Sequence, residues 1–150
     1  MAAREDLALA SLFSGLALAN AGLGAVHGFA APIGGMFPAP HGAVCAALLP
    51  HVMVANIRAL RERASNGAVL RRYEEIGCLL TGRPAATADE GVKWVGGLVA
   101  ELGIPRLGSY GIEKIQIGEL VEKASIASSM KGNPIGLTTQ ELTEVLQAAI

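Results

Sequence analysis

Apolar and charged positions divide the chain into two parts. No Asp, Glu, Lys or Arg occurs between Leu7 and Ile57, whereas residues 58–150 mix charged and apolar positions. In that second part apolar residues recur at the i, i+3, i+4 and i+7 spacing of a helix face, and no segment alternates with the period of two of a half-buried strand. The pattern predicts an all-α fold, in which residues 1–57 form the interior and amphipathic helices surround it.

Start and stop signals set the expected helices. Thr87 with Glu90, and Thr138 with Glu141, have the spacing of a capping box, in which both side chains bond free N–H groups of the first turn. Ser65 is a further candidate for a helix cap. The helices expected in chain order are Arg4 to about Gly22, His41 to Leu60 with a kink near Pro50, one after Ser65, one after Thr87, Glu113 to about Ser128, and one after Thr138. Residues 103–111 are expected to form a loop and residues 131–136 a turn.

Composition restricts the partners. The 150 residues suffice for a single domain with a core, 51% of them are hydrophobic, and the net charge is −1. Nothing in this balance attracts a polyanion, so we expect no nucleic acid. The five arginines from Arg58 to Arg72 are interrupted by glutamates, which is typical of a solvated helix face. The acidic start lacks the basic region of a secretory signal, and we expect a cytoplasmic protein.

A membrane-spanning helix is the competing interpretation of the charge-free part. The segment from Leu7 to Val26 has about the length of a span. Twelve of its twenty residues are Ala, Gly, Ser or Asn, and no Trp or Tyr marks an interface. A buried pair of helices explains the same composition, so we expect no membrane association.

Two histidines are the strongest candidates for chemistry. His27 and His41 lie in the charge-free part, where an imidazole is unfavourable unless something binds it. Neutral imidazole is the commonest protein ligand for transition metals. On a straight helix their separation of fourteen positions would span ~21 Å, whereas two ligands of one ion need their nitrogens ~3–3.5 Å apart. The chain must therefore fold back, and five residues could end or bend a helix there: Pro32, Gly34, Gly35, Pro38 and Pro40. Two core or surface histidines at the ends of a bent linker are the alternative.

Further candidate ligands are weaker. His51 is expected to be a structural or surface residue, because it points about 80° away from His41 on the same helix. Cys45 lies one turn after His41 on the same face and could be a third ligand, although a cysteine in such an apolar run is more typical of a core. Cys45 and Cys78 match no metal or redox spacing and are expected to be buried free thiols. Two histidines do not complete a metal site, so the other ligands must come from elsewhere.

A family resemblance begins at these residues and extends over nearly the whole chain. The motifs that carry it are Gly22-Leu-Gly-Ala-Val-His27-Gly, Pro32-Ile-Gly-Gly, Pro40-His41-Gly42, Leu48-Leu-Pro-His51-Val-Met, Gly103-Ile-Pro105, Gly132-Asn133-Pro134 and the Glu141-Leu142 helix. They closely resemble the iron-containing alcohol dehydrogenases, a group that includes lactaldehyde reductases and butanol dehydrogenases.

The resemblance implies how the chain would fit into a larger enzyme. The family enzyme has an α/β domain that binds NAD or NADP and an all-helical C-terminal domain, with a metal held in the cleft by one Asp and three His. His27 and His41 match the last two histidine ligands. The Asp, the first His and the glycine-rich phosphate loop belong to the part that precedes this chain in the family. Many relatives carry a further His where this chain has Ala31, so no proton-relay role is carried over.

The function implied by the resemblance is the C-terminal part of an NAD(P)-dependent, metal-dependent alcohol dehydrogenase. The expected cofactors are Fe2+ or Zn2+ at an incomplete site and NAD(P) through the absent domain. The expected partners are that nucleotide-binding domain, a small alcohol or aldehyde, and further copies in a homo-oligomer. The isolated chain should be inactive. The alternative is a non-catalytic helical interaction module that packs on a partner chain.

Overall fold

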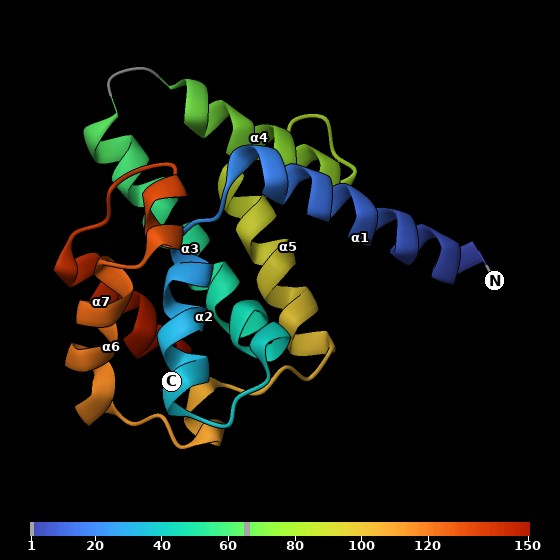
Figure 1. The fold of residues 1–150 in the computed structure, drawn as a ribbon. Helices are drawn as coiled ribbons and strands as arrows, with labels where there is room; N and C mark the ends of the chain where they lie inside the picture. Colours follow the sequence, from blue (N-terminus) through green and yellow to red (C-terminus); the bar gives the residue numbers. More distant parts are fainter. Residues whose placement is uncertain (1, 65–66) are drawn as a thin grey trace.

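The computed structural model describes residues 2–64 and 67–150, and these form helices and connecting loops without a strand. Figure 1 shows the arrangement, with helices α1 to α5 in the first two thirds of the chain and α6 and α7 in the last third. The α-helices are α1 (Ala2–Ala21), α2 (Ala25–Met36), α3 (His41–Arg63), α4 (Ala68–Thr81), α5 (Ala88–Glu101), α6 (Ile117–Ser125) and α7 (Thr139–Ala149). Three 3-10 helices join them: η1 (Leu107–Tyr110), η2 (Lys114–Gln116) and η3 (Ser128–Gly132). The all-α prediction is confirmed.

The core lies between α2, α3, α6 and α7. Phe29 and Ile33 of α2 and Leu48 of α3 are completely buried, and they belong to one cluster with Leu120 of α6 and Leu146 of α7. Burial of each such side chain stabilises the fold by roughly 1.5–3 kcal/mol. The central position of α2 and α3 agrees with the prediction that the charge-free part forms the interior, as far as residues 25–57 are concerned.

The prediction of an interior is wrong for residues 2–21. No residue of α1 is buried, and α1 projects from the body of the molecule in Figure 1. Its exposed apolar side chains are Leu7, Leu9, Leu12, Phe13, Leu16 and Leu18. The helix ends before Gly22, whose φ of +74° is readily adopted only by glycine, and α2 starts at an angle of 101° to α1. The segment Leu7–Val26 is therefore not one straight helix.

Among the residues that the structure describes, two elements have the length and apolar composition of a membrane span. One is α3 and the other is the bent pair of α1 and α2. In α3, 56% of the most apolar 18-residue stretch is buried inside the protein. A core helix of a globular domain has this property, because its apolar side chains contact neighbouring helices instead of lipid.

The break between the two histidines lies at Pro38 and Pro40, two of the five residues predicted to end or bend a helix there. Pro32, Gly34 and Gly35 are inside α2, which ends only at Met36. A proline inside a helix costs about 3 kcal/mol, but α2 buries Phe29 and Ile33 completely on either side of Pro32. Their burial outweighs the proline, since it stabilises the helix by roughly 1.5–3 kcal/mol for each side chain. The chain folds back at residues 37–40.

The capping boxes at Thr87 and Thr138 are both confirmed, with their side chains accepting from Glu90 N and Glu141 N. The continuous helix predicted from Glu113 to Ser128 is wrong, because the segment starts with the 3-10 helix η2 and α6 already ends at Ser125. The predicted loop and turn contain η1 and the end of η3. The predicted cap at residue 65 lies outside the described residues. The helix predicted from His41 to Leu60 is α3, which extends to Arg63 and contains Pro50.

Candidate metal centre

The fold-back between α2 and α3 brings the two predicted histidines together. His27 is on the first turn of α2 and His41 is the first residue of α3. Their ring centroids are 5.4 Å apart and their planes are inclined by 48°. His27 is half-buried and His41 is exposed. The rings therefore lie side by side at the surface, where further protein can reach them.

Cys45 completes a cluster of three possible ligands. It lies one turn after His41 on α3, and its Sγ is 3.5 Å from Nε2 of His41. One ligand atom each of His27, His41 and Cys45 can be chosen so that all three lie within 4.8 Å of one another. Around a tetrahedral zinc ion, bond lengths of ~2.1 Å to nitrogen and ~2.3 Å to sulfur set ligand atoms about 3.4–3.6 Å apart. The residues present therefore fit one metal ion after small side-chain rotations.

The protonation states of the cluster follow from its surroundings. Burial, followed by the neighbouring His41, lowers the pKa of His27, which favours the neutral imidazole that binds metals. Burial raises the pKa of the Cys45 thiol, so the metal-free protein carries it protonated. The two cysteines are half-buried rather than fully buried as predicted. Cys78 is on α4, where its thiol donates to the carbonyl oxygens of Pro84 and Ala86 at 3.4 and 3.5 Å.

His51 does not belong to this cluster. It is half-buried on α3, and burial followed by the charge of Arg106 lowers its pKa. It lines a small cavity with residues of α3 and α7, including Arg58 and Glu144. Its half-buried position, outside the cluster, agrees with the prediction of a structural or surface residue.

An open cavity of about 400 Å³ lies beside His27 and Cys45. Most of its lining is apolar, and Asn56, Tyr73 and Asn133 add polar groups. Burial raises the pKa of Tyr73, whose hydroxyl oxygen accepts from Asn56 Nδ2 at 3.1 Å. The cavity is large enough for a small ligand or a protruding side chain of another domain.

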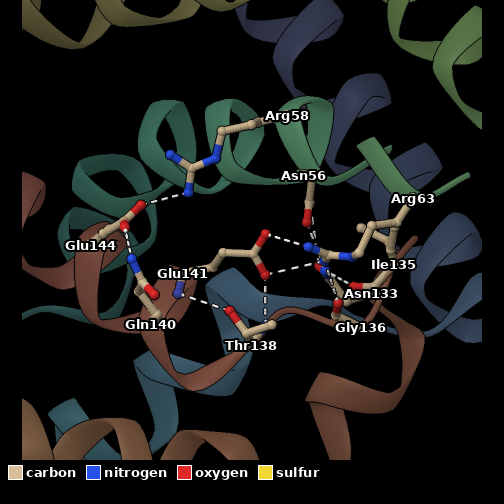
Figure 2. A network of polar contacts seen from close by, with 10 residues as sticks. All are labelled: Asn56, Arg58, Arg63, Asn133, Ile135, Gly136, Thr138, Gln140, Glu141 and Glu144. Atoms are coloured by element: carbon tan, nitrogen blue, oxygen red, sulfur yellow. Dashed lines mark hydrogen bonds and ion pairs between the residues drawn. The ribbon is translucent and has the colours of Figure 1, made fainter. Parts of the chain in front are cut away.

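Asn133 fixes the start of the helix that carries His27. Its Oδ1 accepts a hydrogen bond from the backbone N–H of Ala25 at 3.0 Å. Its Nδ2 donates to Asn56 Oδ1 on α3 and to the carbonyl oxygen of Ile135, as Figure 2 shows. Sequence reasoning placed Asn133 only in a turn and missed this role. The one available signal was Asn56, a polar residue on the buried face of an apolar helix.

A second polar contact joins the end of α3 to the start of α7. Arg63 donates to both carboxylate oxygens of Glu141, at 2.8 and 3.1 Å, and to the carbonyl oxygen of Gly136 (Figure 2). Hydrogen bonds from Arg63, together with those from Thr138, lower the pKa of the buried Glu141 to about 2. Arg58 and Arg61 also form ion pairs, with Glu144 and Asp89. Three of the five arginines on the predicted solvated face thus form ion pairs, and their side chains are 37–47% exposed.

The fold and the cluster define a helical domain with imidazole and thiol groups gathered at the start of two central helices. The family described as Fe-containing alcohol dehydrogenase, C-terminal, matches residues 1–150. The chain belongs to this family, as the resemblance predicted.

Individual relatives agree with this assignment. The chain is 33% identical to a 1,3-propanediol dehydrogenase of Klebsiella pneumoniae over 149 residues, which are 98% of this chain and 37% of that protein. It is 34% identical to a lactaldehyde reductase of Escherichia coli over 148 residues, which are 98% of this chain and 38% of that protein. The chain thus spans little more than a third of the length of these relatives.

Solved structures show the same fold. A crystal structure of a 1,3-propanediol oxidoreductase superposes with a TM-score of 0.82 at 28% identity, over 99% of this chain and 38% of the other. An archaeal alcohol dehydrogenase from a Red Sea brine pool superposes with a TM-score of 0.86 at 25% identity, over 99% of this chain and 38% of the other.

Proposed function

We propose that the chain is the helical domain of an NAD(P)-dependent, metal-dependent alcohol dehydrogenase and that His27 and His41 are two of its metal ligands. The observation that carries the proposal is the 5.4 Å approach of two imidazoles that are fourteen residues apart in sequence. It occurs at the start of two central helices in a fold that the iron-type alcohol dehydrogenases share.

The reaction implied is hydride transfer between an alcohol carbon and a nicotinamide. A bound Fe2+ or Zn2+ would supply Lewis-acid polarisation of the alcohol or carbonyl oxygen. His27 and His41 would hold and orient the ion through their ring nitrogens. The packing of α2 on α3 keeps the two helix starts close together, and the half-buried position of His27 limits access of water from its side.

The remaining ligands and the nicotinamide would come from a nucleotide-binding domain. A cleft between two domains also explains why the His pair lies at the surface and why an open cavity adjoins it. The substrate would be a small alcohol or aldehyde. We propose a cytoplasmic homo-oligomer, in which iron and zinc remain alternatives because imidazole binds both.

Metal analysis of histidine variants tests the ligand assignment. The purified chain is loaded with Zn2+, passed over a desalting column and analysed for bound metal, alongside His27→Ala, His41→Ala and His51→Ala. The first two variants should lose most of the metal, whereas His51→Ala should retain it because His51 lies outside the cluster. If the original chain retains metal and all three variants retain the same amount, the assignment is removed.

An activity measurement tests the dependence on a second domain. The 150-residue chain, given Fe2+ or Zn2+, NAD(H) or NADP(H) and short alcohols or aldehydes, should show no turnover, since the proposed nucleotide site and the remaining metal ligands would belong to another domain. Full dehydrogenase activity of the chain alone would contradict the need for another domain.

A helical interaction module without catalysis is the second candidate. The exposed apolar side chains along α1 favour it, because such a surface is typical of a docking face. A module of this kind would bind its partner equally well after His27→Ala and His41→Ala. An alcohol dehydrogenase would lose activity with the same substitutions once its nucleotide-binding domain is present.

A further inference from the structure

We infer that Cys45 is a third metal ligand, so that this chain alone holds a soft metal ion through two imidazoles and one thiolate. The inference rests on the proposed metal centre and goes beyond it in two respects. It adds a sulfur ligand that the Asp and three His of the family site do not include. It also assigns metal binding to the helical domain in the absence of a nucleotide-binding domain.

The geometry of Cys45 and His41 is the first argument. Their Sγ and Nε2 atoms are 3.5 Å apart. In a tetrahedral zinc site a sulfur and a nitrogen ligand are separated by about 3.6 Å, given bond lengths of ~2.3 and ~2.1 Å. One edge of the coordination polyhedron is therefore already formed. The i, i+4 spacing on α3 produces it, because residues one turn apart project from the same helix face.

The position of His27 is the second argument. It comes from a different helix, and its ligand atom lies within 4.8 Å of the other two. The three donors would form one face of a tetrahedron once the His27 side chain rotates to bring its ligand atom to about 3.4–3.6 Å from the other two. Both residues line the open cavity, so a fourth ligand has access.

The chemistry of the donor set selects the ion. On binding, the Cys45 thiol loses its proton to solvent and forms a sulfur–metal bond. Thiolate and imidazole together suit Zn2+ and Co2+, whereas Fe2+ in an alcohol dehydrogenase centre has carboxylate and imidazole ligands by family resemblance. The chain alone should therefore prefer Zn2+ over Fe2+.

Cobalt spectroscopy on the 150-residue chain tests the inference without an activity assay. Under anaerobic conditions the metal-free chain is titrated with Co2+, and a near-ultraviolet thiolate-to-cobalt charge-transfer band is expected. Cys45→Ser should abolish the band and weaken Co2+ binding about tenfold or more. Cys78→Ser is the matched control, since Cys78 is the other cysteine of the chain and lies on α4. It should retain band and affinity.

Thiol alkylation gives a second measurement that leaves position 45 intact. In Cys78→Ser the only remaining thiol is that of Cys45, and Zn2+ should slow its reaction with iodoacetamide about tenfold or more. This protection should disappear in the double variant Cys78→Ser, His41→Ala. The experiment keeps the inference testable if Cys45→Ser fails to fold, which circular dichroism would reveal.

The outcomes separate this inference from the proposed function. Cobalt binding that His27→Ala abolishes, but without a charge-transfer band, overturns the role of Cys45 and leaves the histidine pair as ligands. The absence of any Co2+ binding by the chain overturns a resident three-ligand site, whereas a dehydrogenase centre completed by another domain remains. If His27→Ala and His41→Ala leave metal binding unaffected, neither the three-ligand site nor the histidine pair of the proposed function holds.

Discussion

The side-chain amides of Asn56 and Asn133 bond to each other in both directions. Asn133 Nδ2 donates to Asn56 Oδ1 at 2.7 Å, and Asn56 Nδ2 donates to Asn133 Oδ1 at 3.3 Å. The same Asn133 oxygen accepts from the N–H of Ala25, two residues before His27. The pair therefore connects α3 and the loop before α7 to the first turn of the helix that carries a proposed ligand.

Replacement of Asn133 by Ala should lower the free energy of unfolding by about 1–3 kcal/mol, because the Ala25 N–H and the buried Asn56 amide lose a partner. Urea denaturation followed by circular dichroism measures the change. Asn20→Ala is the matched control, since the Asn20 amide is exposed and bonds only to the Leu16 carbonyl oxygen one turn earlier. Equal effects of the two substitutions would show that the amide pair does not stabilise the fold.

Gly132, next to Asn133, allows the loop before α7 to pack closely against the backbone of Leu23. A Cβ atom at this position would collide with the carbonyl oxygen of Leu23, in the break between α1 and α2. Gly132→Ala should therefore destabilise the protein by about 1–3 kcal/mol through displaced backbone. Gly136→Ala serves for comparison because nothing lies within 4 Å of its Cβ position, and its effect should stay within about 0.5 kcal/mol. Thermal unfolding of both variants checks the difference.

The features of the fold that could be predicted from sequence are those set by residues close together in the chain. The capping boxes at Thr87 and Thr138 follow from two residues three positions apart, and both occur as expected. The approach of His27 and His41 followed from a metal's need for converging ligands. Of the five residues expected to break the helix, Pro38 and Pro40 do lie in the turn at residues 37–40. The other three do not break it, because the burial of residues around Pro32 keeps α2 helical to Met36.

The contacts that escaped prediction join distant segments. Asn133 and Ala25 are 108 positions apart, and Arg63 and Glu141 are 78 apart. No local pattern encodes such pairs, since any of several polar residues could have met across the core. The exposure of α1 was not predicted for a related reason. Apolar periodicity shows that a helix has a surface to cover, but not whether this chain or another protein covers it.

Glu141 should make stability depend on acid pH. Hydrogen bonds from Arg63, with those from Thr138, lower its folded-state pKa from an ordinary value of 4.5 to about 2. The folded state therefore binds the proton less readily than the unfolded state. The stabilisation is fully present above about pH 4.5 and is lost as the pH falls towards about 2. The shift corresponds to roughly 3 kcal/mol.

Urea denaturation between pH 2 and 6 measures this dependence. In Glu141→Gln the free energy of unfolding should fall less steeply between about pH 4.5 and 2 than in the original chain. Glu144→Gln is the comparison, since the Glu144 side chain is 40% exposed and its ion pair with Arg58 is open to solvent. An unchanged pH profile in Glu141→Gln would refute the assignment of this acid sensitivity to Glu141.

Two arginine ion pairs of similar geometry should differ in how much they stabilise the fold, because only one of them has a buried carboxylate. Glu141 is 8% exposed beside Arg63, whereas Asp89 is 55% exposed beside Arg61. Arg63→Met should lower the free energy of unfolding by about 1–3 kcal/mol, because it leaves a buried carboxylate without its cation. Arg61→Met should cost less than about 1 kcal/mol. Chemical denaturation at neutral pH compares them, and a larger loss from Arg61→Met would contradict the argument.

The exposed face of α1 should cause the isolated chain to self-associate. Six large apolar side chains on this helix are 46–69% exposed, and none of its residues is buried. Leu12 and Leu16 lie one turn apart on one face, so Leu12→Lys with Leu16→Lys should place two like charges there and raise the monomer fraction in sedimentation velocity. Leu79→Lys on α4 is the control, since Leu79 is 83% exposed but belongs to another helix. It should leave association unchanged. A chain that is monomeric at every concentration, or an α1 variant that associates as the original does, would show that this surface does not bind a second copy.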